Sequence, residues 1–433
     1  PEYIIWNYDH CLEAFKAVEN NARKNPDVEF ENYHGFNGLL YVQDPAVDEF
    51  DISKDVFKVA RTFGIPYNKD FNGAKQNGVG RYQLMMKDGK RFTLADGYLK
   101  DALKKVMVYP SKPFIKGYPH VPGDDNVGKF VGVNVKSFTH VLNIIWKEDE
   151  NVAIGVRYSY CGKDHNCYIA PKGEVIICGG AINSPQILML SGIGPKKNLE
   201  DNNIKVRKEL PVGHNLWDHP LCIITASVSV PGNIEGKIPS QEEFNDERPD
   251  IQQYSVAALF DHGILDEHPT DEKDFYSMST TLNLPSSVGH LELRSSDPFD
   301  HPKIFLNYYD KPEDLYRMMS SLKLSRKILE QPPLSTYWGV KVIGLDEVND
   351  DKEWEKYIRK RTTSAHPCGT VKMAPESKGG CVNHRLQVYG TKNLRVVDAS
   401  IFPTIPAGNI NAPTAMVAWR ASKLIEEDYC KKV

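Results

Sequence analysis

The octet HPCGTVKM, from His366 to Met373, puts a histidine in a segment punctuated by proline and glycine. This pattern predicts a loop or sharp turn, and loops carry chemistry more often than packed cores do. A histidine there could act as a general base, because its side chain exchanges a proton near neutral pH. The alternative is a turn histidine whose ring is satisfied by backbone partners, and the octet alone does not choose between the two.

A second group of candidate residues lies near the C-terminus, in VVDASIFPTIPAGNINAPTAM. Residues 394–397 predict a buried strand, and Asp398 follows at its carboxyl end, where ligands of open α/β sheets bind. Asp398 could cap a helix or bind a cofactor hydroxyl. Asn409 and Asn411 could form turns or reach into a site, and Pro413 predicts the first turn of a helix.

A third segment, GEVIICGGAINSPQILMLSGIGP, has the order strand, glycine turn, helix. Residues 175–177 form a short apolar run that ends at Gly179 and Gly180, and Ser184 is predicted to cap a helix that begins at Pro185. A helix N-terminus behind two glycines could receive a phosphate or the edge of a cofactor. A packing turn in an α/β sheet is the alternative.

The composition is typical of a soluble globular protein and argues against several classes. The 433 residues carry a formal net charge of −4 and no basic block, which gives no reason to expect nucleic acid as a partner. No apolar run approaches the roughly 18 residues of a membrane span. The eight cysteines form no CxxC pair, so we expect neither a disulfide scaffold nor a metal site. Neither a signal peptide nor an N-glycosylation acceptor is found, and the compartment stays open.

Further elements are predicted in the parts of the chain outside these three segments. Surface helices are predicted over residues 8–24 and 47–63. The Pro/Gly/Lys-rich stretch 109–130 predicts an irregular seam, after which VKSFTHVLNIIW and VAIGVRYSY predict paired strands. The stretch 227–260 is predicted to be irregular.

Four stretches of the chain, in this order, resemble the glucose-methanol-choline (GMC) family of flavin-dependent oxidoreductases. GGAINSPQILMLSGIG is similar to the family's second signature, and VGHNLWDHP at residues 212–220 resembles its Val-Gly-x-Asn-Leu-x-Asp-His element. HPCGTVKM resembles the segment of the catalytic histidine, and the C-terminal stretch resembles the segment that closes over the flavin. YHGFNGLLYV and GHLELRSSDPFDHPKI are weaker matches to the insect glucose-dehydrogenase-like branch.

The resemblance implies FAD as cofactor and oxidation of an alcohol CH–OH group, with hydride transfer to the flavin. It also implies that His366 takes the hydroxyl proton and that Asn409 orients the substrate oxygen, with Asn411 as the alternative. Cys368 is given a packing role. Sugars, sterols, choline-like amines and simple alcohols all stay open as substrates. The residues expected at the cofactor are Asp398, Ala399, Asn411, Ala412, Pro413 and Thr414.

One family feature is missing from the sequence. No G-x-G-x-x-G turn, which would bind the FAD pyrophosphate, occurs in the chain, and Trp419 stands where a glutamate is usual. We therefore expect a family member that lacks its first segment, with a separate N-terminal fragment as a partner beside the alcohol substrate. The alternative function is a catalytically silent chain that serves as a binding or structural module.

The expected fold is α/β plus α+β, in which an incomplete Rossmann-like FAD-binding domain is interleaved with a mixed-sheet substrate-binding domain. Residues 133–220 and 385–433 are assigned to the FAD-binding domain. Residues 221–384 are assigned to the substrate-binding domain, and residues 1–132 to linking helices and part of that domain.

Overall fold

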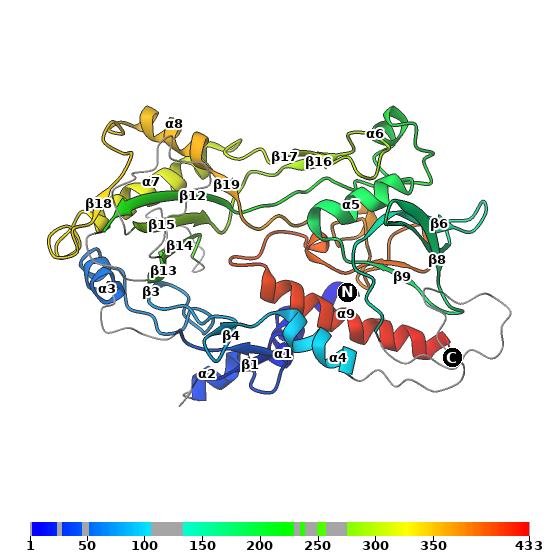
Figure 1. Ribbon diagram of the computed structural model, residues 1–433, viewed down its shortest axis with the longest axis horizontal. Coiled ribbons are helices and arrows are strands. Elements are labelled where there is room, and N and C mark those ends of the chain that lie inside the picture. Colours follow the sequence, from blue (N-terminus) through cyan, green and yellow to red (C-terminus); the bar gives the residue numbers. More distant parts are fainter. Residues whose placement is uncertain are drawn as a thin grey trace.

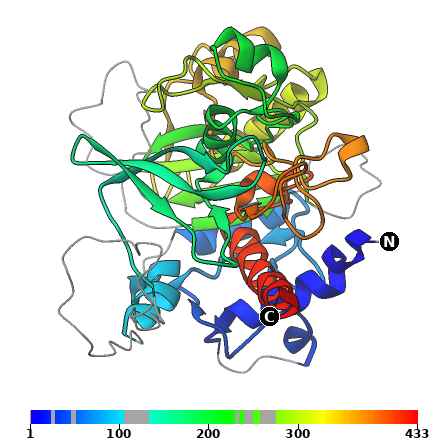
Figure 2. The ribbon, with the colours of Figure 1, turned by 90° about the vertical axis from the view of Figure 1, so that its right-hand side faces the viewer.

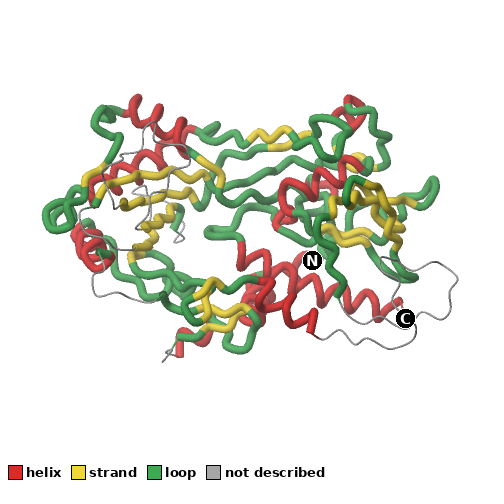
Figure 3. Tube along the Cα trace, in the orientation of Figure 1, coloured by secondary structure: helices red, strands yellow, loops and turns green. Residues whose placement is uncertain are grey.

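The computed structural model describes residues 2–23, 28–45, 52–104, 133–228, 234–238, 249–256 and 275–432. The predicted seam at 109–130 lies outside the described residues. Figure 1 shows a large sheet at one end of an elongated molecule, smaller sheets toward the other end, and one long helix below them. Long loops and the short strands β16 (His290–Glu292) and β17 (Lys303–Phe305) run between the two ends (Figure 3).

The large sheet has seven strands in the order β18-β12-β15-β14-β13-β3, and β19 also pairs with β12. All of these pairings are antiparallel. The helices α7 and α8 lie on the same side of the sheet (Figure 1), and α7 shares a hydrophobic core with Ile224 and Met278. The prediction that 227–260 is irregular is wrong for residues 234–238 and 251–256, which form β13 and β14 by pairing with each other and with β3 and β15. Residues 229–233, 239–248 and 257–260 lie outside the described residues. The elements are β3 (Gly78–Val79), β12 (Pro220–Ser227), β13 (Ile234–Ile238), β14 (Ile251–Val256), β15 (Phe275–Leu282), β18 (Lys341–Val342), β19 (Thr363–Ser364), α3 (Ser53–Thr62), α7 (Pro312–Leu329) and α8 (Asp351–Arg361).

A second hydrophobic core lies around a parallel strand pair, β9 with β20, and the helix that follows β9. The predicted strands at 175–177 and 394–397 are confirmed as this pair. The predicted pairing of VKSFTHVLNIIW with VAIGVRYSY is also confirmed, as β6 with β7. The domain boundaries given above stay a prediction. The elements are β6 (Thr139–Trp146), β7 (Ala153–Tyr160), β8 (Lys163–Tyr168), β9 (Val175–Ile177), β20 (Leu394–Val396), α5 (Gly180–Leu190), α6 (Lys196–Asp201), β10 (Ile193–Gly194), β11 (Lys208–Glu209), and the short helices η3 (Glu376–Lys378) and η4 (Ala399–Ile401).

The two ends of the chain pack together. Helix α1 lies against the long helix α9, as Figures 1 and 2 show from two sides. The Arg420 guanidinium of α9 donates to the Ile5 carbonyl at 2.7 Å, and the Trp6 indole donates to the His384 carbonyl at 2.7 Å. The elements are η1 (Glu2–Trp6), α1 (Tyr8–Val18), β1 (Glu19–Asn21), α2 (Val28–Tyr33), β2 (Leu40–Val42), β4 (Met86–Lys87), β5 (Lys90–Arg91), η2 (Ala95–Leu99), α4 (Lys100–Lys104) and α9 (Asn411–Lys432).

Two predicted helix boundaries differ from the structure. The helix predicted over 8–24 ends at Val18, because the next residues leave the helix to pair in parallel with β2. The helix predicted within residues 47–63 is confirmed as α3, Ser53–Thr62, and residues 47–51 lie outside the described ones. Helix α5 begins at Gly180 rather than at Pro185, for a reason that lies in the site described below.

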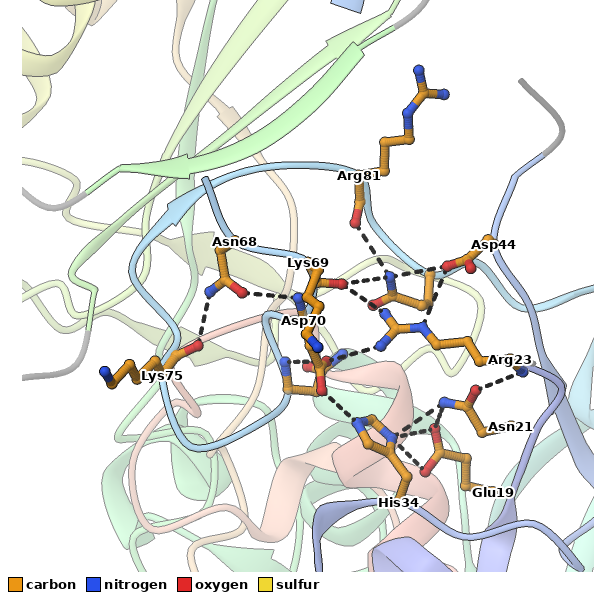
Figure 4. A network of polar contacts seen from close by, with 12 residues as sticks. Glu19, Asn21, Arg23, His34, Asp44, Asn68, Lys69, Asp70, Lys75 and Arg81 are labelled. Carbon is orange, nitrogen blue, oxygen red and sulfur yellow. Dashed lines mark hydrogen bonds and ion pairs between the residues drawn. The ribbon is translucent and has the colours of Figure 1, made fainter. Parts of the chain in front are cut away.

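A polar network fixes the N-terminal segment to the loop that precedes β3 (Figure 4). Its centre is His34, which is buried and lies 3.0 Å from both carboxylate oxygens of Glu19 and 3.1 Å from Asp70 Oδ2. Arg23 approaches Asp70 at 3.6 Å from the other side. Burial opposes a charge on His34, but the hydrogen bonds to Asp70 and Glu19 outweigh it and raise its pKa to about 9. The network is therefore a buried cation held between two carboxylates.

Within the described ranges, no helix is both long and apolar enough to span a membrane. The same ranges contain no group of three or more His, Cys, Asp and Glu side chains arranged to hold a metal ion.

Candidate active site

His366 follows β19, and one buried carboxylate, that of Asp218, holds its backbone. The His366 amide donates to Asp218 Oδ1 at 2.6 Å, and the Ala365 amide donates to the same oxygen at 3.3 Å. The hydroxyls of Tyr308 and Ser364 donate to Asp218 Oδ2. Asp218 is only 4% exposed, so hydrogen-bond donors replace the water that a carboxylate normally requires. These contacts fix the position of the loop that carries His366.

The next residue along the chain, His219, holds the His366 ring. Its Nε2 lies 3.0 Å from the carbonyl oxygen of Asn283, which can only accept, so this nitrogen carries the hydrogen. Its Nδ1 lies 3.0 Å from His366 Nδ1, and with the hydrogen on Nε2 it accepts the hydrogen of His366 Nδ1; the carbonyl of Pro406 also faces the His219 ring. In this tautomer Nε2 of His366 has a lone pair and no protein partner among the described residues.

Both rings are kept neutral by their surroundings. Burial and the neighbouring His366 ring lower the pKa of His219 to about 3. Burial also lowers the pKa of His366, although the Asp218 carboxylate opposes this shift. A neutral imidazole can accept a proton, so both directions suit the role that the sequence predicted for His366.

Backbone geometry explains the glycine in HPCGTVKM. Cys368 exchanges two backbone hydrogen bonds with Trp217, at 3.0 and 2.8 Å. Gly369 then turns with φ +87°, and a Cβ at this position would lie 2.5 Å from the carbonyl oxygen of Asn215. Neither the backbone angle nor the space suits a side chain. Cys368 is fully buried in the second core, in keeping with the packing role predicted for it.

The rest of the octet is bound to the segments that contain the other motifs. Each of three consecutive residues donates one hydrogen bond to a different partner in α5 or η4. The bonds are Gly369 N to Ala399 O at 3.0 Å, Thr370 Oγ1 to Ala181 O at 2.6 Å, and Val371 N to Ser400 O at 2.7 Å. The motifs that lie far apart in the sequence therefore meet at the octet.

Asn409 lies on the loop before α9 and is exposed. Its Oδ1 accepts from the Tyr254 hydroxyl at 2.8 Å and from Gln252 Nε2 at 3.2 Å. Its amide nitrogen remains as a donor that could bind a substrate oxygen. Among the described residues no hydrogen bond joins Asn409 to His366, but the carbonyl of Pro406 on the same loop faces His219.

Asp398 caps α5 from across the sheet edge. Its Oδ2 accepts from the Gly180 amide at 2.9 Å and from the Ser184 hydroxyl, and its Oδ1 accepts from the Ser400 amide at 2.7 Å. This long-range cap explains why the helix begins at Gly180. The prediction that Ser184 caps a helix from Pro185 is therefore wrong. Asp398 and Ala399 are buried at the carboxyl end of β20, where the sequence predicted a cofactor contact.

The first turn of α9 presents the other residues predicted to bind cofactor. Asn411 and Ala412 are exposed, and Pro413 and Thr414 are half-buried. Pro413 lies in the first turn, as predicted. No acidic side chain occupies this turn, so the positive end of the helix dipole is not neutralised within the helix.

Sequence reasoning assigned no role to Asp218, His219, Gln252 and Tyr254. The first two stand inside VGHNLWDHP, where a histidine directly after an aspartate was a usable signal. Gln252 and Tyr254 lie in the stretch that was predicted to be irregular, so no pattern marked them.

The sequence was compared with protein-family models and with known proteins, and both comparisons found related proteins. Two models of one family, GMC oxidoreductase, match the chain: the C-terminal model covers residues 285–418, and the N-terminal model covers residues 2–109 and 124–221. An alcohol dehydrogenase [acceptor] of Pseudomonas putida is 30% identical over 97% of this chain and 75% of its own length. Mitochondrial choline dehydrogenase of Mus musculus is 31% identical over 97% of this chain and 70% of its own length.

Solved structures give the same fold. Pyridoxine 4-oxidase from Mesorbium loti superimposes with a TM-score of 0.78 at 22% identity, covering 97% of this chain and 77% of that one. A formate oxidase superimposes with a TM-score of 0.79 at 20% identity, covering 98% and 79%.

Proposed function

Because the chain belongs to the GMC oxidoreductase family, a family that uses FAD, we propose that it oxidises the CH–OH group of a small alcohol, with His366 as the base. The observation that carries the proposal is the histidine pair. His219 takes the Nδ1 hydrogen of His366 and leaves Nε2 as a lone pair on a ring whose pKa is lowered.

The residues at the two helix N-termini fit FAD. A Cβ added to Gly180 would meet no atom within 4 Å, so the space beside the end of β9 is open to a flat group. Ser400 Oγ is buried at the same edge, and no described residue forms a hydrogen bond with it. The first turn of α9, from Asn411 to Thr414, would hold an electron-rich ring edge through its dipole. FAD, when bound, supplies the acceptor for the hydride.

The chain's own residues then have distinct tasks. His366 Nε2 accepts the hydroxyl proton as the carbinol carbon loses its hydride. Asn409 cannot take a proton, but its amide nitrogen can donate to the substrate oxygen and fix its orientation. Asp398 acts only through the backbone that it holds in place, because its carboxylate accepts hydrogen bonds from the Gly180 and Ser400 amides.

Stopped-flow reduction of the FAD-loaded protein by alcohol tests this assignment. His366→Ala should slow flavin reduction by roughly 10² to 10⁴, with a much smaller effect on substrate affinity. Asn409→Ala should cost roughly tenfold, since it removes one neutral hydrogen bond. Cys368→Ala, next to the base but buried in the core, is the matched control and should reduce its flavin nearly as fast as the parent protein. Parent-like reduction by His366→Ala would show that His366 is not the base.

The finer assignments are also proposals. Kinship with the insect glucose-dehydrogenase-like branch is supported by YHGFNGLLYV and GHLELRSSDPFDHPKI. The alternative of a catalytically silent chain is separated from the leading proposal by the same stopped-flow experiment, because a silent chain would not reduce bound flavin with any alcohol.

A further inference from the structure

Three polar side chains near the candidate site are buried with atoms that have no hydrogen-bond partner among the described residues. They are Gln252 Oε1, Thr281 Oγ1 and both amide atoms of Asn283. The three residues are 2%, 0% and 0% exposed. Buried polar atoms are nearly always paired, and an unpaired one destabilises the folded state. Several of them in one place point to a group that they bind.

Gln252 and Thr281 share one face of the large sheet, because Gln252 on β14 is the direct cross-strand partner of Thr281 on β15. Asn283 follows just beyond the end of β15, and its amide continues the pairing by donating to the Asp250 carbonyl at 2.7 Å. The opposite face belongs to the core with α7, which contains Met278.

This set of three side chains, the β14–β15 polar row, lies between the two residues proposed to meet substrate. At one end, the Asn283 carbonyl accepts from His219, which orients His366. At the other end, the Gln252 amide donates to Asn409. A substrate held by His366 and Asn409 would therefore lie along the row.

We propose that the β14–β15 polar row binds further hydroxyl oxygens of the substrate, so that the preferred alcohol is a polyol. The inference rests on the proposed function. An amide and a hydroxyl can each donate and accept, as a sugar-like hydroxyl does. β12, β14 and β15 bring no charged side chain to this face, but the register of the next strand, β13, sets Lys237 opposite Gln252 and Glu235 opposite Tyr254.

Substrate must displace a covering side chain to reach the row, since none of the unpaired atoms touches water. A quaternary ammonium such as choline would leave the row unpaired. A site whose polar groups need partners discriminates strongly against a substrate that lacks them.

The test compares erythritol with 1-butanol, which share chain length and a primary carbinol. Turnover of the FAD-loaded protein gives kcat/KM for each, and calorimetry gives binding without turnover. The parent protein should prefer erythritol in both measurements. Thr281→Val and Asn283→Leu should each lower the erythritol to 1-butanol ratio about five- to tenfold, without lowering the unfolding midpoint, because each removes an unpaired buried group.

Tyr276→Phe is the matched control, since it removes a hydroxyl that the same strand buries in the opposite face. Its ratio should equal that of the parent protein. Equal binding of the two alcohols by the parent protein, preference for choline over erythritol, or unchanged ratios in the Thr281 and Asn283 variants would overturn the inference. Absence of any alcohol oxidation, with the binding preference intact, would instead overturn the proposed function.

Discussion

At the scale of single residues, the properties of His366 come from its two partners rather than from its own loop. Asp218 fixes its backbone and His219 fixes its ring, and these partners are consecutive in the sequence. The sequence could predict that His366 lies in a loop, because proline and glycine around a histidine are a local pattern. It could not predict the tautomer, since that depends on a carbonyl at Asn283 that only the folded chain brings near.

His219 can be tested as a positioning residue. His219→Leu removes the acceptor for the His366 Nδ1 hydrogen. The His366 ring can then rotate, and its Nε2 no longer has a fixed orientation. We expect the limiting rate of flavin reduction to fall by roughly tenfold or more, while substrate affinity changes little. His219→Gln offers an amide oxygen as acceptor and should recover part of the rate. If the Leu and Gln variants are equally slow, the hydrogen bond is not what orients the base.

At the scale of elements, the sequence predicted features that depend on neighbouring residues and missed helix ends that depend on distant residues. The apolar runs at β9 and β20 and the proline in the first turn of α9 act through neighbouring residues, and the sequence predicted all three. The start of α5 depends on Asp398, which is 218 residues away from Gly180, and no local pattern contains that information. The end of α1 depends in the same way on pairing with β2.

Gly369 permits a test of how the octet is shaped. Gly369→Ala combines a left-handed backbone angle with a clash against Asn215, whereas Gly379→Ala has a similar angle, φ +74°, and open space. Gly379→Ala should destabilise the protein by about 1 kcal/mol. Gly369→Ala should cost more and also slow flavin reduction. Urea unfolding and stopped-flow measurements on both variants separate the effect of the backbone angle from that of the clash with Asn215. Equal losses of stability and of rate in the two variants would contradict the role of the clash.

The buried His34 cation predicts a pH dependence of stability. Its pKa of about 9 in the folded protein exceeds the ordinary value of 6.5, so protonation favours folding. This contribution is fully present below pH 6.5 and is lost as the pH rises through 9, to the extent of about 3 kcal/mol at most.

His34→Gln keeps hydrogen-bonding groups but not the charge. The difference in free energy of unfolding between the parent protein and His34→Gln should therefore shrink from pH 6 to pH 10, as followed by urea titration. Other groups titrate in both proteins and cancel in this difference. A difference that is constant with pH would show that His34 is not charged in the folded state.

At the scale of the whole molecule, the proposed FAD site draws on both helix N-termini but on no glycine-rich phosphate turn of the G-x-G-x-x-G type, which the sequence does not contain. We predict that the 433-residue chain retains less than one FAD per chain after gel filtration. The flavin absorbance of the eluted protein measures this directly. A stoichiometric flavin band would show that other residues of the chain bind the pyrophosphate.

The octet at residues 366–373 is hydrogen-bonded to segments that lie far from it in the sequence. This has a consequence for the order of events in folding. His219 and His366 are separated by 147 residues, and Thr370 and Ala181 by 189 residues. Closing loops of this length requires most of the chain to be collapsed already, so contacts of this kind form late in folding. Helical content in α5 and α9 can return early on refolding, but the contact between His219 and His366 forms only after the last long-range pairing. Under the proposed function, reactivity toward alcohol would therefore report the completed fold rather than any part of it.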